Sequence, residues 1–313
     1  MSFVIFDTMC PTAKSGRAKL NRFLTRLIAI AILPLQVHGA EVRRENVTQL
    51  TQTFRNIPRQ SAEVIEDLGD IRPLADRSFF RRLRFTSSLY GEFVSNALSI
   101  GDHSSGDFVL MPSVSAAFDE SLGHGLSIAG TARTEAFLYS NFDEQSFWGF
   151  SGAAMARYQP TKEWPRIFAG IEAYSYASVR TGSQISDALA VTAGIEKEWA
   201  FNRDQTVLFI AYSFSNFFSS PPVDNRLLHR ATLGITQQIV PSLYGQLFYS
   251  YQFSDYTNLD RQDSRNFVGA NLVYQFKDHW FARVSTYLVD SHSSRSAFSY
   301  QTFGVGLGAG YNF

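Results

Sequence analysis

The chain has 313 residues, of which 45% are hydrophobic and 15% aromatic, and its 28 basic and 28 acidic side chains leave no net charge. A balanced charge offers no basic surface for nucleic acid, so we expect no nucleic-acid partner. No run of about 18 apolar residues occurs, which argues against a helical membrane protein but not against membrane-spanning strands, in which only every second residue meets lipid.

Residues 1–40 have the pattern of a secretory signal peptide. Leu27–Leu35 forms a short apolar stretch, and the small residues Gly39 and Ala40 suit cleavage. Cleavage there would remove Cys10, the only cysteine, so we expect neither disulfides nor a cysteine nucleophile in the exported chain. The basic residues that precede the apolar stretch are Lys14, Arg17, Lys19, Arg22 and Arg26.

Residues 41–80 differ in composition from the rest of the chain. They are polar and charged, with prolines at 58 and 73 and a short helical periodicity around Ser61–Leu68. Two interpretations stay open, a periplasmic leader and a plug that folds into the interior of the domain that follows.

Residues 81–313 divide into twelve runs of strand-like sequence separated by turn signals. Two kinds of separator alternate along the chain: longer ones rich in Ser, Asp and Asn, and tighter ones such as VPSL and KDH. The runs start near Leu83, Phe108, Gly125, Phe147, Arg166, Ala188, Thr206, Leu227, Leu243, Asn266, Trp280 and Phe298.

Within the runs, apolar residues alternate with polar or small ones. The tenth run places Val268, Leu272 and Tyr274 on one face and Asn271 and Gln275 on the other. Charge is scarce inside the runs and concentrated in the separators. A soluble sandwich would hide the apolar face and expose charged residues, so this pattern favours a barrel with lipid outside and polar groups inside.

Tryptophan provides an independent indication. Trp164, Trp199 and Trp280 lie at or near the tight turns, and Trp148 lies near the other end of its strand. Indole rings favour the interface between membrane and water, so we expect two aromatic girdles.

The last strand alternates strictly. Phe303, Val305, Leu307, Ala309, Tyr311 and Phe313 share one face, while Asn312 and four glycines share the other. This ending, with the girdles and the strand rhythm, resembles the Gram-negative outer-membrane β-barrel proteins, including the porins. The resemblance implies an all-β, antiparallel, up-and-down transmembrane barrel of about twelve strands, with a short N-terminal periplasmic segment. It also implies outer-membrane lipids as surroundings and Phe313 as the signal that the barrel assembly machinery reads.

Two details of the interior remain open at this stage. The inward glycines of the last strand either make room for a plug or for neighbours such as Tyr287 and Phe281, or only permit coiling of the strand. Charged residues on neighbouring strands are candidates for one patch on the lumen wall, either as ion pairs or as a selective constriction. These lumen candidates are Arg133, Glu135, Arg157, Glu172 and Glu196.

The function expected from the sequence is a channel for small solutes. The alternative is the barrel component of an envelope machine that exports polysaccharide or protein. The run NLDRQDSRNFVGANLVYQFKDHWFARVSTYL, residues 258–288, is similar to barrels of exopolysaccharide-export systems. A lipid hydrolase is not expected, because only His229 lies near an outward rim position, and we expect no cofactor or metal.

Overall fold

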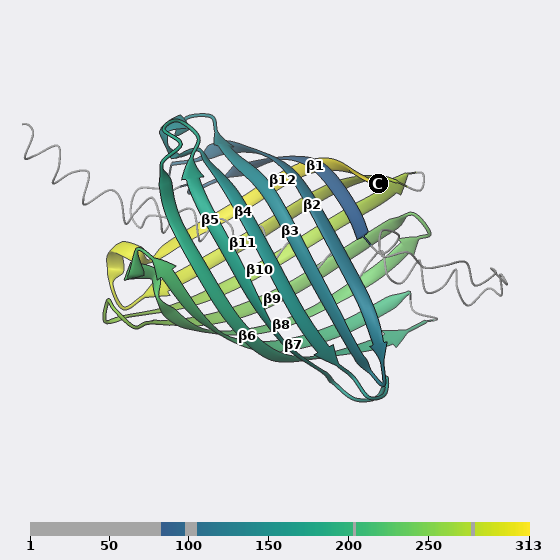
Figure 1. The fold of residues 1–313 in the computed structure, drawn as a ribbon. Helices are drawn as coiled ribbons and strands as arrows, with labels where there is room; N and C mark the ends of the chain where they lie inside the picture. Colours follow the sequence, from purple (N-terminus) through teal and green to yellow (C-terminus); the bar gives the residue numbers. More distant parts are fainter. Residues whose placement is uncertain (1–82, 98–104, 203–204, 277–278) are drawn as a thin grey trace, which may run out of the picture.

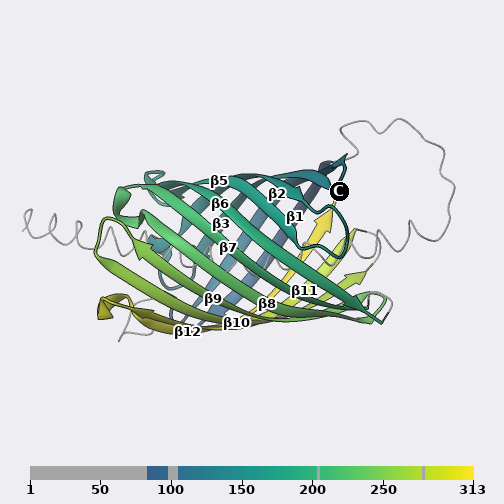
Figure 2. The same cartoon turned by 90° about the horizontal axis from the view of Figure 1, so that it is seen from below.

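The computed structural model describes residues 83–97, 105–202, 205–276 and 279–313, which form one closed antiparallel barrel of twelve strands (Figures 1 and 2). Each strand pairs with its neighbours in sequence, and β1 pairs with β12. The strands are β1 (Leu83–Val94), β2 (Asp107–Gly123), β3 (Leu126–Tyr139), β4 (Phe147–Tyr158), β5 (Arg166–Ser178), β6 (Gln184–Phe201), β7 (Thr206–Ser220), β8 (Arg226–Val240), β9 (Leu243–Tyr256), β10 (Arg261–Phe276), β11 (Trp280–Ser293) and β12 (Tyr300–Asn312). The all-β barrel predicted from the sequence is therefore confirmed, including its strand number.

The two ends of the barrel differ. We call the end that holds the carboxyl terminus the turn end and the opposite end the loop end; they lie at the right and left of Figure 1. The 3-10 turns η2 (Asp143–Gln145), η3 (Pro222–Asp224) and η4 (Ser296–Phe298) all belong to connections at the loop end. At the turn end, β2 passes to β3 through His124 between Gly123 and Gly125, all three with positive φ, a conformation that glycine adopts without strain.

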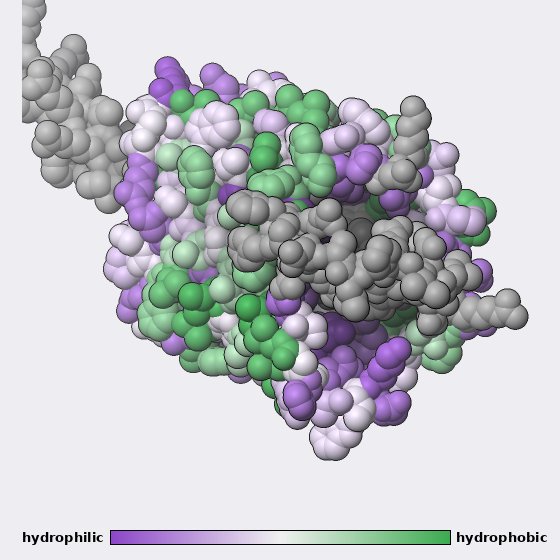
Figure 3. Space-filling model, turned by 45° about the vertical axis from the view of Figure 1, so that its right-hand side comes forward, coloured by the Kyte–Doolittle hydropathy of each residue, from purple (hydrophilic) through white to green (hydrophobic). Residues whose placement is uncertain are grey.

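The period of two in the sequence separates an apolar outside from a more polar inside. Leu247 and Leu307 on the outer face are 54% and 65% exposed, whereas the inward Gln246 is 6% exposed. Hydrophobic side chains form patches on the side wall of the face drawn in Figure 3, and strongly hydrophilic ones gather towards its ends. This inversion, with large apolar side chains exposed all around the wall, is typical of a barrel surrounded by lipid.

The glycines of β12 lie beneath bulky neighbours. A Cβ on Gly306 or Gly308 would collide with the ring of Tyr90, one on Gly304 with Tyr287, and one on Gly310 with Phe281. The glycines thus make room for aromatic rings on the inner wall, which was one of the two interpretations left open by the sequence.

The strand starts agree with the sequence analysis to within one residue, except in three strands. β6 and β10 begin four and five residues earlier than expected, at Gln184 and Arg261, and β12 begins two residues later, at Tyr300. The expected signal peptide and the leader of residues 41–80 lie outside the described residues. Among the residues that are described, there is no helix of the length and apolarity needed to span a membrane.

Candidate functional site

The inner wall of the barrel is the candidate functional site, because a closed barrel encloses it on all sides. Its side chains are connected across strands in level rows. In one row Gln246 on β9 donates to Thr236 Oγ1 on β8 at 3.0 Å and accepts from Asn271 Nδ2 on β10 at 3.2 Å. Such rows satisfy polar groups within the wall and leave the lumen side hydrophilic.

Four of the five charged lumen candidates make ion pairs, which fall into two groups. Arg133 and Glu135 pair with each other on β3 at 2.7 Å. Arg157 and Glu196 lie towards the turn end, where each has a different partner. Arg157 Nη1 contacts Asp119 Oδ2 at 2.8 Å, and Arg166 Nη1 contacts Glu196 Oε1 at 2.7 Å.

The turn-end group is electrostatically connected, since Arg157 interacts with Glu196, Arg166 and Glu198. The Arg133 group instead includes Glu92 and Arg283, because Arg283 interacts with both Arg133 and Glu92. Glu172 lies on the inner face of β5 and is half-buried. Ion pairing is therefore established for four of the five candidates.

The seam between the first and last strands carries its own polar contacts. Tyr287 on β11 donates to Glu92 Oε1 at 2.5 Å, across the glycines of β12. The Tyr90 hydroxyl bonds to Ser285, and Arg283 lies 4.2 Å from the centroid of the Tyr90 ring. Side chains of β1 and β11 thus meet over the glycine strand and close the barrel.

Aromatic rings line much of the remaining inner wall. Phe137 and Phe147 stack with ring centroids 4.5 Å apart, and Phe147 meets Tyr176 edge-on at 5.3 Å. On the other side of the barrel Phe267 stacks between Phe248 at 5.5 Å and Tyr287 at 5.4 Å. These clusters stabilise the wall, because a pair of stacked rings contributes more stabilising free energy than the burial of its surface area alone.

Arginines form a feature that the sequence analysis did not single out. On the inner wall Tyr256 of β9 is the cross-strand partner of both Arg226 and Arg261, and Gln252 is that of both Arg230 and Arg265. We call these two levels the arginine rows. They lie at the loop end, on β8, β9 and β10.

A sequence signal for the arginine rows exists. Both β8 and β10 begin with the spacing Arg-x-x-x-Arg, in Arg226–Arg230 and in Arg261–Arg265. The pattern was hidden because residues 261–265 are charged enough to look like part of a separator. Pairing both strands with β9 then places the two motifs side by side.

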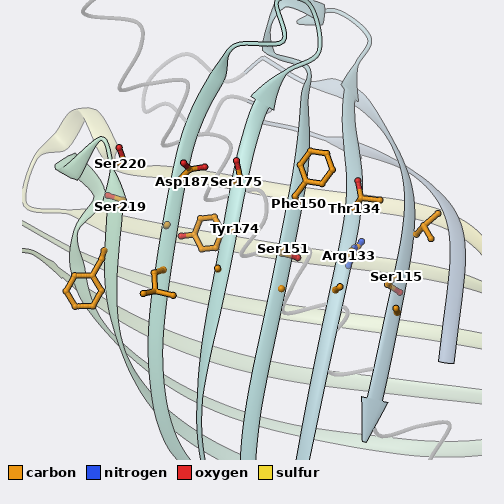
Figure 4. Close-up of a pocket in the computed structure, with 18 of the residues that line it drawn as sticks. Ser115, Arg133, Thr134, Phe150, Ser151, Tyr174, Ser175, Asp187, Ser219 and Ser220 are labelled. Carbon is orange, nitrogen blue, oxygen red and sulfur yellow. The ribbon is translucent and has the colours of Figure 1, made fainter. Parts of the chain in front are cut away.

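A groove of about 960 Å³ lies on the outside of the wall and not in the lumen, and it follows two outward rows across β1 to β7 (Figure 4). Its floor is made of small residues, Ala116, Ala132, Gly152 and Ala173, with Leu189 and Phe218 beyond them. We assign it to the lipid-facing surface, because Phe150 and Leu189 in its lining are strongly exposed on the outer face.

The tryptophans and the terminal phenylalanine all lie at the ends of the wall. Trp148 is at the loop end, and Trp164, Trp199 and Trp280 are at the turn end; each of the four is more than 40% exposed. The Phe313 amide donates to the Phe85 carbonyl at 2.9 Å while its side chain is 70% exposed. Within the described part of the chain no cluster of His, Cys, Asp and Glu is placed to hold a metal ion.

Comparisons with known proteins agree with this architecture. Residues 170–313, from within β5 to the carboxyl terminus, match the sequence model of the family described as "Putative beta-barrel porin 2". No curated protein matches the chain. An outer-membrane channel from Pseudomonas putida F1 has a similar fold, with a TM-score of 0.51, 10% sequence identity, and coverage of 78% of this chain and 100% of the channel.

Two further solved structures are more distant. The outer membrane channel DcaP of Acinetobacter baumannii has a TM-score of 0.41 and 13% identity, covering 74% of this chain and 96% of its own. The KdgM porin, solved with disordered oligogalacturonate, has a TM-score of 0.42 and 10% identity, covering 73% and 99%. The chain therefore has the fold of a closed twelve-strand barrel with an apolar outer wall, and its carboxy-terminal part, residues 170–313, is similar to a porin family.

Proposed function

We propose that the barrel is a passive channel that lets small hydrophilic solutes cross the outer membrane. The observation that carries this proposal is the inverted wall: large apolar side chains outside, and charged or hydrogen-bonding rows such as Thr236–Gln246–Asn271 inside. A wall of this kind suits a water-filled interior, because buried polar groups need hydrogen-bond partners that lipid does not provide.

The strand number sets the width of such a channel. Twelve strands spaced about 4.8 Å apart and tilted by about 40° give a backbone radius of roughly 12 Å. Inward rings such as Phe137, Phe147 and Phe267 occupy part of this radius. The geometry therefore suits small solutes better than folded proteins.

The charged lumen candidates are proposed to tune ion selectivity. Replacing Glu172 and Glu196 by Gln removes two negative charges from the wall, so we expect the cation-to-anion permeability ratio to fall. Glu144→Gln is the matched control, because that carboxylate pairs with Arg180 in an exposed loop. An unchanged reversal potential in planar bilayers would exclude the two glutamates from selectivity and leave the Arg133–Glu135 and Arg157 pairs as structural supports.

The exposed rings at both ends of the wall are proposed to act as membrane anchors. Trp148 at the loop end and Trp164, Trp199 and Trp280 at the turn end would mark the two membrane interfaces. Phe313 is proposed as the contact of the assembly machinery, since it is 70% exposed at the turn end.

No catalytic role is proposed. His229, the outward histidine considered from the sequence, bonds through Nδ1 to the Tyr212 hydroxyl at 2.7 Å. Its other described ring contacts are Phe214 and Phe253. An imidazole held among aromatic rings lacks the arrangement of nucleophile, base and orienting carboxylate that a hydrolase needs.

Reconstitution tests the channel directly. Full-length protein that shows heat-modifiable gel mobility, and is therefore folded, is inserted into planar bilayers in KCl. We expect discrete current steps that scale with salt concentration. Folded protein that stays silent across repeated insertions would refute the channel.

The role of residues 41–80 can be separated from that of the barrel. Deleting Glu41–Arg77 should leave conductance intact if these residues are a leader, and should increase it if they plug the lumen. Loss of a periplasmic partner in pull-downs, with conductance retained, would instead favour a barrel that serves an export machine.

A further inference from the structure

The groove of about 960 Å³ climbs the outer wall obliquely. It crosses β1 to β7, which is six of the twelve strand spacings of the barrel. One end is Phe85, the third residue of β1 at the turn end, and the other is Ser220, the last residue of β7 at the loop end. With strands about 4.8 Å apart and tilted by about 40°, the groove is roughly 29 Å long and rises roughly 19 Å along the barrel axis. That rise exceeds half of a hydrocarbon core about 30 Å thick.

The groove has a floor of small residues. Ala132, Gly152 and Ala173 are cross-strand neighbours on β3, β4 and β5, and Phe150 beside them is 54% exposed. An empty groove would leave these lining atoms without dispersion contacts. Because hydrocarbon surrounds the wall, the hydrophobic effect does not distinguish one apolar occupant from another, so shape and polar contacts decide what fills the groove.

A second copy of the chain does not have the shape to fill the groove. Two barrels in one membrane stand with parallel axes and convex walls, so they touch along a line parallel to the axis and over a few strands. The groove instead crosses the strands through half of the circumference. A flexible acyl chain can follow this oblique path, whereas a rigid barrel wall cannot.

The groove has a polar end at the loop end of the barrel. Ser175, Asp187 and Ser220 are cross-strand neighbours on β5, β6 and β7 and lie in one line (Figure 4). Asp187 is the fourth residue of β6 and shares the outer face with Leu189, two residues further along. A charge on the outer face is costly at the bilayer midplane and tolerated near the interface, so this row marks the level of the lipid headgroups.

The polar end carries a negative charge. Among the described residues that line the groove, the only basic side chain is Arg133, and it pairs with Glu135 at 2.7 Å. Asp187 Oδ2 accepts from Gln184 Nε2, and the two oxygens of a carboxylate offer about four acceptor sites in all. An ammonium group suits this end both as a donor and as a cation, whereas an anionic headgroup is repelled.

We propose that the outer groove binds a phospholipid with an ammonium headgroup, of the phosphatidylethanolamine type. Its acyl chains lie along the floor of small residues, and its ammonium group donates to the Asp187 carboxylate. The hydroxyl groups of Ser175 and Ser220 donate to the phosphate oxygens. Because the groove is on the outside of the wall, this binding does not depend on conduction through the lumen.

Native mass spectrometry of the full-length protein, released from detergent micelles, tests the proposal. The two probes are phosphatidylethanolamine and the anionic phosphatidylglycerol, with identical acyl chains. Asp187→Asn removes the charge at the polar end, and the double variant Ala132→Phe/Ala173→Phe fills the floor. Heat-modifiable gel mobility confirms that each variant is folded.

Each variant has a matched control outside the groove. Asp290→Asn is the control for charge, because Asp290 also lies near the loop end of its strand, β11, and accepts from a glutamine side chain, that of Gln301 at 3.1 Å. Ala231→Phe is the control for bulk, because Ala231 is an exposed alanine on β8.

We expect the wild-type protein to retain one phosphatidylethanolamine molecule and to bind phosphatidylglycerol more weakly. Asp187→Asn should weaken the binding of phosphatidylethanolamine about 5-fold, the effect of one unit charge about 4 Å away in water, without weakening that of phosphatidylglycerol. The double Phe variant should lose both lipids, and both controls should match the wild type.

Equal retention of the two lipids, unchanged by Asp187→Asn, would overturn the assignment of an ammonium headgroup. Phosphatidylethanolamine retained by the double Phe variant would overturn the groove as the site. A dimer mass that disappears when the groove is filled would assign the groove to a second copy of the chain and overturn the lipid site. A bilayer that stays silent although the lipid is retained would refute the channel function and leave this inference intact.

Discussion

The carboxylate of Asp107 fastens the connection after β3 to the start of β2, and its replacement by Asn should destabilise the loop end. Oδ1 accepts from the Phe108 amide at 2.7 Å and from the Asn141 amide and side chain at 3.0 Å. Oδ2 accepts from the Asn141 and Phe142 amides at 3.1 Å. Asp107 is 1% exposed, so water does not replace these bonds.

Asparagine keeps the shape of the side chain but turns one acceptor into a donor that faces backbone N–H groups. One or two charge-assisted hydrogen bonds are lost, at about 1.5–3 kcal/mol each, so we expect a loss of roughly 1.5–6 kcal/mol in unfolding free energy. Guanidinium titration in lipid bilayers measures this value, with an unchanged slope if only stability changes.

Asp143→Asn is the matched control for this prediction. Asp143 lies in the same connection and also accepts a backbone amide, that of Glu144 at 2.9 Å, but it is exposed. Its replacement should change stability by less than about 0.5 kcal/mol. Equal small effects of both substitutions would refute the reasoning that burial makes the Asp107 contacts strong.

Three further predictions concern single contacts. Gly306→Ala places a methyl group against the Tyr90 hydroxyl, so it should destabilise the barrel by about 1–3 kcal/mol, and Tyr90→Phe in the same chain should recover part of the loss in a double-mutant cycle. Lys197→Met removes the ammonium that donates to the Lys162 carbonyl at 2.8 Å and the Glu163 carbonyl at 2.5 Å, so hydrogen exchange in that turn should accelerate; unchanged exchange would show that the contact is dispensable. Deleting Phe313 should slow assembly in cells while refolding in detergent remains normal, and equal slowing in both settings would point to a structural role.

The architecture was predictable from the sequence because barrel strands alternate with a strict period. In β9, for example, Leu247, Tyr249 and Tyr251 alternate with Gln246, Ser250 and Gln252, and the structure places the two sets on opposite faces. Periodicity is a local property, so it is visible in a single sequence. The pairing of β1 with β12 was also predictable, because a barrel closes only when its first strand pairs with its last.

Positions along the barrel axis were less predictable. The alternation of apolar and polar residues predicts which face of the sheet a residue occupies. It does not predict the position of that residue along the barrel axis, because tilted strands are displaced relative to one another. The structure therefore separates Arg133 and Glu135 from Arg157 and Glu196, although neighbouring strands contribute them. Arg133 and Glu135 pair with each other, whereas Arg157 and Glu196 pair with Asp119 and Arg166, which the sequence analysis had not matched.

The arginine rows were missed for a related reason. Residues 261–265 contain three charges in five positions, which is typical of a loop, yet they begin β10. A strand accommodates such charges when inward arginines stack on rings such as Tyr256 and Phe298. These contacts become visible only when the strands are paired, because the arginines and the rings belong to different strands or connections.

The central claim is that neighbouring residues of one strand face water and lipid in turn, and cysteine labelling at Ala153 and Ala154 of β4 tests it most directly. The structure places Ala153 on the inner face and the exposed Ala154 on the outer face. In bilayers, Ala153→Cys should react with a membrane-impermeant charged thiol reagent, whereas Ala154→Cys should resist it and, once labelled with a fluorophore, be quenched by a lipid-dissolved spin probe. Equal reaction at both sites, or the reverse pattern, would contradict a water-filled barrel with a lipid-facing wall.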